Sequence, residues 1–370
     1  MRTSGRSPEE RWRRLVRRDL AALPVYQAIQ SPDALARELG LAPEAVIKLD
    51  GNENPYGCSP RVRAALASYP HFHTYPDPAQ TALRQELSGY TGIGPQHIVA
   101  GSGSDEIIDL LLRLLLEPGD NVINAIPTFG MYDFSTRVCG GRVVDVPRDE
   151  SFGLRVEDML AAVDPTTKII FVANPNNPTG MLTPTDALRP LLDAGPLVVV
   201  DEAYYEFSGQ TIASWVPRHD NLVVLRTFSK WAGLAGLRVG YGLMASGLAQ
   251  QLLAMKSPYN VNVAAEVAVH ESLADREYLL TTVRAILKER ARLFAALQRI
   301  SYLKPWPSQA NFILCQVTRG DARALHQELR RRGIFVRYFD TPRLRDALRI
   351  TVGRPEHTDS IIRALEETVP

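Results

Sequence analysis

The chain has 370 residues, more than one hydrophobic core usually serves, so two domains are expected. Hydrophobic residues make up 45% and charged residues 22%, and the net charge is +1. This balance is typical of a globular protein and gives no electrostatic case for a nucleic-acid partner. No apolar run approaches the roughly 20 residues of a membrane helix. Three scattered cysteines, Cys58, Cys139 and Cys315, indicate a reducing cytoplasm rather than a disulfide framework or a thiolate metal site.

The N-terminal segment is rich in arginine, with seven in residues 1–20, balanced in part by acidic residues. Residues 7–10, Ser-Pro-Glu-Glu, have the pattern of a helix start. The apolar residues that follow share one helical face; they are Trp12, Leu15, Val16 and Leu20. We therefore expect a short amphipathic helix docked on the body of the protein.

The middle of the chain alternates β-rich runs with helical patterns. The runs cover 97–100, 121–126, 141–146, 168–174, 197–203 and 221–228, and the helical patterns 104–117, 130–139, 157–163 and 184–194. This alternation predicts an α/β fold with a mainly parallel sheet. Apolar runs such as "LVVV" favour strands covered on both faces.

The pattern changes near residue 263. One long helical stretch extends to Ile300, and three strand-like runs around a helix at 321–332 follow it. We predict a large α/β domain at 49–262 and a smaller α+β domain at 263–370, with residues 1–48 forming an N-terminal arm and part of the smaller domain.

Two of the predicted strands end in turns that could hold a ligand. In "IVAGSGSDE" a helix begins near Ser104, and its N-terminus would favour an anion, although a plain capped turn is the better explanation of this motif taken alone. In "NPNNPTG", 174–180, Asn177 could donate to a ligand oxygen, although two prolines and a glycine also make a rigid turn.

The next two strand ends carry charged residues. Asp201 follows an apolar strand, where a carboxylate either caps a helix or pairs with a cationic ligand atom. Lys230 lies in "TFSKWAGLAGLRVGY", 227–241, among small and apolar residues. A surface lysine is the plain interpretation, but a buried lysine is costly unless it is chemically used, for example to form an imine. Together, Ser104, Asn177, Asp201 and Lys230 supply what pyridoxal phosphate requires.

With these four residues in this order, the chain resembles the fold-type I pyridoxal-phosphate aminotransferases, in the subgroup that contains the histidinol-phosphate aminotransferases. The resemblance extends from about residue 23 to residue 352 and also rests on the motifs "LDGNENPYG", "YPD", "PTFGMY", "DEAY" and "LRITVG". It implies a large domain with a seven-stranded, mainly parallel sheet flanked by helices, and a smaller α+β domain.

The resemblance also implies roles for individual residues. Lys230 would hold pyridoxal 5'-phosphate and then act as acid and base, and both burial and Arg238 would depress its pKa. Asp201 would pair with the ring nitrogen, and Asn177 and Tyr204 would bind the ring oxygen. The expected ligands of the cofactor phosphate are Ser102, Gly103, Ser104, Thr227, Ser229 and Arg238.

Two aromatic residues have further implied roles. Phe129 would stack on the cofactor ring, at a position where relatives often carry tyrosine. Tyr56 would reach the cofactor phosphate of a partner subunit, so a homodimer with shared sites is expected. No metal site is expected, because His71 and His73 have no further ligands nearby.

The implied substrates are a small amino donor and a 2-oxo acid. Arg349 would bind the α-carboxylate of glutamate and 2-oxoglutarate, since a guanidinium suits a carboxylate bidentately, although an arginine on a surface strand is the plain alternative. Tyr26 and Arg337 match positions that bind the phosphate of histidinol phosphate in the subgroup, and Asn54 is a further candidate substrate contact.

The expected reaction is transamination of L-histidinol phosphate with 2-oxoglutarate, giving imidazole acetol phosphate and L-glutamate in histidine biosynthesis. An aromatic amino-acid aminotransferase and a threonine-phosphate decarboxylase share nearly the same motifs. A regulatory or sugar-binding protein could reuse the fold, but such a protein is expected to lack the lysine or the aspartate, and both are present.

Overall fold

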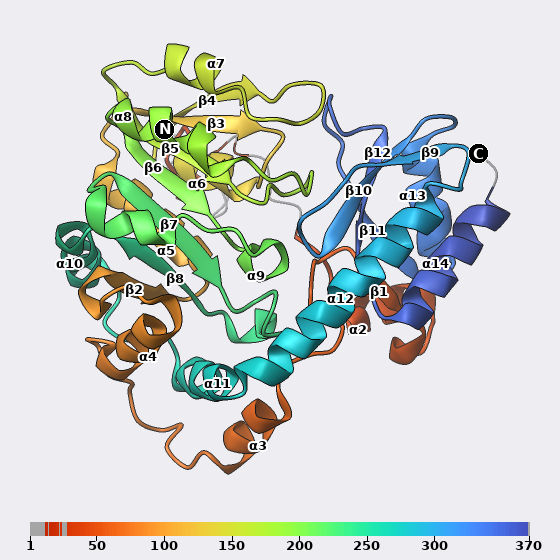
Figure 1. Ribbon diagram of the computed structural model, residues 1–370, viewed down its shortest axis with the longest axis horizontal. Helices are drawn as coiled ribbons and strands as arrows, with labels where there is room; N and C mark the ends of the chain where they lie inside the picture. Colours follow the sequence, from red (N-terminus) through yellow and green to blue (C-terminus); the bar gives the residue numbers. More distant parts are fainter. Residues whose placement is uncertain (1–11, 14, 22, 24–27, 369–370) are drawn as a thin grey trace, which may run out of the picture.

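The computed structural model describes residues 12–368, apart from residues 14, 22 and 24–27. It contains a seven-stranded sheet and a five-stranded sheet. The two sheets lie side by side, and the long helix α12 (Arg276–Leu297) runs from one to the other (Figure 1). Strand β1 (Ile47–Leu49) joins the smaller sheet, far from the rest of that sheet in sequence. The domain boundaries at residues 48 and 262 stay a prediction.

The larger sheet confirms the predicted α/β fold. Its spatial order is β2 (Ile98–Gly101), β8 (Gly240–Met244), β7 (Leu222–Thr227), β6 (Leu197–Asp201), β5 (Thr167–Ala173), β3 (Asn121–Ile126) and β4 (Arg142–Pro147). All neighbours are parallel except those of β8, which runs antiparallel to both β2 and β7. The sequence patterns did not identify β8, because its glycines interrupt the apolar run by which the other strands were found.

Helices cover both faces of this sheet. Alternate strand residues point to opposite faces, so that Val199 packs in one core cluster and Val198 and Val200 in another. The first cluster includes α5 (Ser104–Leu115), α6 (Met131–Val138) and α10 (Ser246–Met255). The second includes α4 (Thr81–Thr91), α7 (Val156–Ala161), α8 (Arg189–Asp193) and α11 (Val263–Ala274). Burial on both faces leaves the ends of the strands as the place for polar chemistry.

The smaller sheet is mainly antiparallel. Its order is β1, β11 (Ile334–Tyr338), β12 (Ala347–Thr351), β10 (Phe312–Val317) and β9 (Leu303–Pro305), and only β1 and β11 are parallel. Helices α13 (Ala322–Arg331) and α14 (Pro355–Glu367) lie beside it, and α2 (Pro32–Leu39) precedes β1 (Figure 1). Two further α-helices in the described part of the chain are α3 (Pro60–Ser68) and the short α9 (Tyr205–Ser208).

The long helix predicted up to Ile300 is in fact two helices. Asp275 leaves the helical conformation, with φ −110° and ψ 29°, between α11 and α12. Its carboxylate accepts a hydrogen bond from the hydroxyl of Ser59, at the start of α3. This tertiary contact offsets the cost of the break, and helical periodicity cannot reveal it because both sides of the break are helical.

The predicted N-terminal helix is present at the described residues 12 and 13 but does not continue after residue 14. Residues 15–21 form turns and bends, and Leu15 is 86% exposed; the proposed helix start at 7–10 lies outside the described residues. The aliphatic residues of this segment therefore do not form a buried face. No helix in the described part of the chain combines the length and the apolar composition that a membrane crossing requires.

Candidate active site

Lys230 lies in the turn after β7, where it contacts the segment that follows β1. Its ammonium donates a hydrogen bond of 3.1 Å to the carbonyl oxygen of Gly51. Burial and, to a smaller extent, the positive charge of Arg349 together lower the pKa of Lys230 to about 8. Arg238, which we had expected to be the cation responsible, has a smaller effect in the same direction. The amine is thus partly neutral near neutral pH, as a nucleophile or base must be.

Asp201 ends β6 and is buried. Its two carboxylate oxygens each accept one hydrogen bond, from the hydroxyl of Tyr132 at 2.7 Å and from the backbone N–H of Ala203 at 3.0 Å. Burial raises the pKa of Asp201 to about 6, although these two hydrogen bonds oppose the rise. The carboxylate therefore remains ionised at neutral pH and could accept a proton or face a cation.

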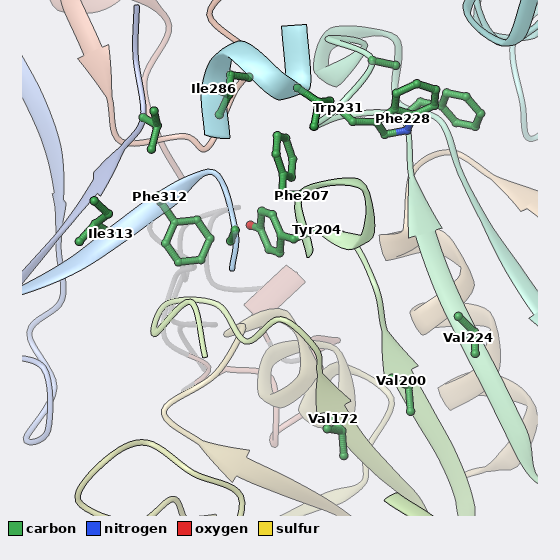
Figure 2. Close-up of a cluster of buried hydrophobic side chains, with 14 of the residues drawn as sticks. Val172, Val200, Tyr204, Phe207, Val224, Phe228, Trp231, Ile286, Phe312 and Ile313 are labelled. Atoms are coloured by element: carbon green, nitrogen blue, oxygen red, sulfur yellow. The ribbon is translucent and has the colours of Figure 1, made fainter. Parts of the chain in front are cut away.

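Tyr204 begins the turn that precedes α9 and points toward the smaller sheet. Its hydroxyl oxygen accepts a hydrogen bond of 2.8 Å from the side-chain amide of Asn52. Its ring meets the ring of Phe312 on β10 edge to face, with 5.1 Å between centroids. Figure 2 shows these two rings beside each other, with Phe207 and Ile286 close by. Tyr204 therefore lies where the larger and smaller sheets meet.

Asn52 was not among the predicted site residues, although the motif "LDGNENPYG" contains it. Its φ of 52° is left-handed, a conformation that asparagine tolerates better than most residues. Its backbone N–H donates to the hydroxyl of Thr351 on β12, and its carbonyl oxygen accepts from the side chain of Asn311. Asn52 thereby connects Tyr204 to the smaller sheet, a contact that no local pattern encodes.

The predicted anion site is assembled around Gly240 of β8. This residue pairs with Gly101, at the end of β2, and with Thr227, at the end of β7. The register brings the start of α5 next to the turn that holds Ser229 and Lys230. A Cβ on Gly240 would lie 2.4 Å from the backbone nitrogen of Ser104, so only glycine fits.

The groups around this point suit a phosphate. Gly103, with φ 79°, precedes α5 and leaves the helix N-terminus open. A Cβ on Gly103 would lie 2.5 Å from the guanidinium of Arg238, which also donates to Asp105 at 3.0 Å. Thr227 and Ser229 bring their hydroxyl oxygens to 3.0 Å of each other. The backbone N–H of Ser102, by contrast, is held by the side chain of Glu106 at 2.6 Å.

Arg349 and Asn177 join the two sheets on the other side of the site. Arg349, on β12, donates to the side-chain oxygen of Asn177 at 2.6 Å and to the carbonyl oxygen of Asp50. Its guanidinium lies over the rings of Phe312 and Phe339, at 5.3 and 5.6 Å. The side chain is buried, so the alternative of a surface arginine is excluded.

Arg337 is the direct neighbour of Arg349 across the sheet. The two residues are register partners on the antiparallel strands β11 and β12, so their side chains leave the same face. The guanidinium of Arg337 lies 5.5 Å from the ring of Phe339. Two cations placed opposite each other carry a repulsive cost, which an anion bound between them would relieve.

For four of the predicted site residues, the structure shows contacts with other parts of the protein or gives no description at all. Asn54 uses its side-chain amide to donate to the carbonyl oxygen of Trp231, 2.8 Å away and next to Lys230 in sequence. The ring of Tyr56 is half-buried beneath the guanidinium of Arg354 at 5.5 Å, and Phe129 packs its ring against Tyr132 at 5.5 Å. Tyr26 lies outside the described residues. The ligand contacts assigned to these four residues stay predictions.

Comparison with known proteins identifies the family. Residues 44–365 match the family described as aminotransferase class I and II. The chain belongs to this family. The resemblance inferred from the motifs is confirmed, and the chain is an aminotransferase by descent as well as by the chemistry of its strand ends.

Individual relatives are similar to this aminotransferase over nearly its whole length. The histidinol-phosphate aminotransferase of Dehalococcoides mccartyi is 48% identical over 355 residues, covering 96% of this chain and 98% of that protein. The protein of the same name from Roseiflexus castenholzii is 48% identical over 362 residues, covering 95% and 98%. The solved structure of histidinol-phosphate aminotransferase from Sinorhizobium meliloti in complex with pyridoxal-5'-phosphate is 29% identical, with a TM-score of 0.87 and coverage of 95% and 96%.

Proposed function

We propose that this aminotransferase moves the amino group of L-histidinol phosphate to 2-oxoglutarate, giving imidazole acetol phosphate and L-glutamate in histidine biosynthesis. The observation that carries the substrate assignment is the opposed pair Arg337 and Arg349. A carboxylate needs one guanidinium, whereas a phosphate ester bears up to two negative charges and suits two. The names of the relatives at 48% identity support the same substrate.

The residues present fit pyridoxal phosphate. Gly103, Ser104, Thr227, Ser229 and Arg238 would hold its phosphate, because they surround the open N-terminus of α5 at a place where no Cβ fits. The buried Asp201 would face the ring nitrogen. When bound, pyridoxal phosphate supplies an electron sink that allows a proton to leave the carbon bearing the amino group.

Other residues would orient the ring. Tyr204 and Asn177 would contact the ring oxygen, and Phe129 would cover one face of the ring. Asn177 also accepts from Arg349, so one amide would connect the cofactor with the residue that binds the acid group of the substrate. This shared contact would fix the angle between cofactor and substrate.

Lys230 would hold the cofactor and then move the proton. With its pKa near 8, the amine can both accept and give up a proton close to neutral pH. A positioned acid–base group of this kind typically contributes about 10²–10⁴ in rate. Arg349 serves two purposes here, because the same charge that binds the substrate acid also helps to lower the pKa of Lys230.

We propose that the enzyme is a cytoplasmic homodimer, with Tyr56 reaching the cofactor phosphate of the partner subunit. Aromatic residues exposed together on the larger-sheet side support self-association. Tyr75 and Tyr259 stack at 4.3 Å while 80% and 46% exposed, and Phe72 is 55% exposed. The three cysteines are free thiols, which suits a reducing compartment. Sedimentation equilibrium tests the dimer; a monomer at micromolar concentration would contradict it.

A single-turnover experiment tests the reaction. The holoenzyme is mixed with L-histidinol phosphate without an oxo acid, and the absorption of the bound cofactor is followed. We expect rapid conversion from the aldehyde to the amine form, reversed by 2-oxoglutarate. If phenylalanine converts the bound cofactor and histidinol phosphate does not, the protein is an aromatic aminotransferase. If it releases CO₂ from threonine phosphate, it is a decarboxylase.

The role of the arginine pair is tested with Arg337→Gln. We expect KM for histidinol phosphate to rise roughly 10- to 100-fold, while the half-reaction with glutamate changes far less. Because both half-reactions are measured on the same protein, misfolding would affect both equally. Equal loss in the two half-reactions would remove the structural support for a phosphate substrate.

A further inference from the structure

Tyr132 contacts Asp201 but is not among the residues expected to touch the cofactor or the substrate. It lies in the first turn of α6, and its side chain is completely buried. Its hydroxyl donates to the Oδ2 atom of Asp201 over 2.7 Å. The motif "PTFGMY" contains this residue, but the sequence alone suggested a role only for Phe129.

The surroundings of Tyr132 fix the direction of this hydrogen bond. Its ring stacks on Phe171 of β5, with 4.6 Å between centroids and planes only 2° apart. The ring of Phe129 meets it edge to face at 5.5 Å. Its carbonyl oxygen accepts from the hydroxyl of Thr136 one turn later. A ring clamped in this way can present its hydroxyl only toward Asp201.

The other groups near Asp201 make the hydrogen bond important. Besides Tyr132, only the backbone N–H of Ala203 donates to the carboxylate within the described residues. The charges of Asp105 on α5 and of Glu202, the next residue, disfavour the ionised form, and burial does so more strongly. The ionised state of Asp201 therefore depends on two hydrogen bonds, and Tyr132 supplies the one that comes from a side chain.

We propose that Tyr132 is a positioning residue that keeps Asp201 ionised and aimed at the ring nitrogen of the cofactor. This inference rests on the proposed function, since it requires pyridoxal phosphate to bind with its nitrogen at Asp201. Through Phe129, the same tyrosine also supports the residue expected to cover the ring. The nitrogen end of the cofactor site is thus built by α6 as well as by β6.

The test is Tyr132→Phe, which removes the hydroxyl and keeps both ring contacts. Wild type and variant are loaded with ¹⁵N-labelled pyridoxal phosphate, and the chemical shift of the ring nitrogen is measured by NMR. Without the donor, the carboxylate becomes more basic and draws the shared proton toward itself. We expect the nitrogen resonance at pH 7 to move toward the unprotonated position, and kcat to fall roughly 10- to 100-fold with little change in KM.

Tyr302→Phe is the matched control. The hydroxyl of Tyr302 is also buried, but it donates to the carbonyl oxygen of Leu365 in the smaller-sheet region. Its loss should lower stability and leave the nitrogen resonance unchanged. If Tyr132→Phe also leaves the resonance unchanged, Tyr132 only packs and the inference is wrong.

A second variant tests the proposal even if Tyr132→Phe does not fold. Replacing Tyr132 by 3-fluorotyrosine keeps the ring and makes the hydroxyl a stronger donor. The nitrogen resonance should then stay at, or move further toward, the protonated position, and a shift in the opposite direction would overturn the proposal. If the wild-type protein binds no cofactor, or binds it without a protonated nitrogen, the proposed function fails first, and that result differs from an unchanged resonance in Tyr132→Phe.

Discussion

The two sheets contribute to the site in different ways. The larger sheet presents Asp201 and Lys230 at the ends of neighbouring parallel strands. Asp201 is held by Tyr132 of α6, and Lys230 donates to Gly51, just after β1 of the smaller sheet. The smaller sheet presents Arg337 and Arg349, and Arg349 reaches across to Asn177 of the larger sheet. The larger sheet therefore supplies the chemical groups of the cofactor end, whereas the acid-binding end is built from the smaller sheet and depends on how the two sheets dock. Substitutions at the two ends should differ accordingly.

The largest effect is expected at the cofactor end, for Lys230→Ala. Removing the amine abolishes covalent attachment of the cofactor and proton transfer, so kcat should fall by at least about 10²–10⁴-fold. Turnover and cofactor absorbance are measured after reconstitution. Lys256→Ala is the control, because this buried lysine donates to the backbone carbonyls of Ser257 and Pro258 rather than to a residue of the site. A Lys230→Ala protein with near-normal turnover would refute the assigned role.

At the acid-binding end, Arg349→Lys should act on binding. An ammonium cannot donate to Asn177, to the carbonyl of Asp50 and to a substrate acid in the same planar arrangement. We expect KM for glutamate and for 2-oxoglutarate to rise roughly 10- to 100-fold, with a smaller fall in kcat. Steady-state kinetics with each substrate give the result. An unchanged KM would show that Arg349 only joins the two sheets.

Between the two ends lies Asn52, and Asn52→Ala tests whether it couples them. The substitution removes the hydrogen bond to Tyr204 and places alanine at a left-handed φ of 52°. The free energy of unfolding should fall by about 2–3 kcal/mol, as measured by urea denaturation. Asn52→Gly accepts the backbone conformation but also lacks the amide, so the difference between the two variants gives the backbone cost alone. Equal stability of all three proteins would exclude a coupling role.

The same division explains what the sequence could predict. Lys230, Asp201 and Asn177 follow apolar strands, and parallel strands bring such ends together, so local pattern sufficed to place them at one edge. Asn52, Tyr132 and Gly240 were missed as site residues because their importance lies in contacts with strands or helices distant in sequence. Strand β8 was missed for a related reason: glycine at its start is dictated by the backbone of Ser104, not by strand propensity.

The smallest expected effect is on the free energy of unfolding, which is reduced by the buried Lys230 when no cofactor is bound. In the unfolded chain the pKa of Lys230 is 10.5, and in the folded chain it is about 8. Between these values the unfolded state binds more protons, so the stability contribution of this group rises with pH. Below pH 8 both states are protonated and the penalty is at its full size, of the order of 2 kcal/mol after allowance for solvent screening.

Lys230→Met should therefore stabilise the protein in the absence of cofactor, most strongly at pH 7 and less at pH 9.5. Urea denaturation of both proteins at the two pH values measures this difference. Lys256→Met serves for comparison, since burial also lowers the pKa of Lys256. A stabilisation that does not shrink with pH would mean that the methionine gains through packing rather than through removal of a buried charge. The expected result would show that the cofactor end is built for a bound group and is destabilised without it, whereas Arg349 of the smaller sheet already has a partner, Asn177, across the junction.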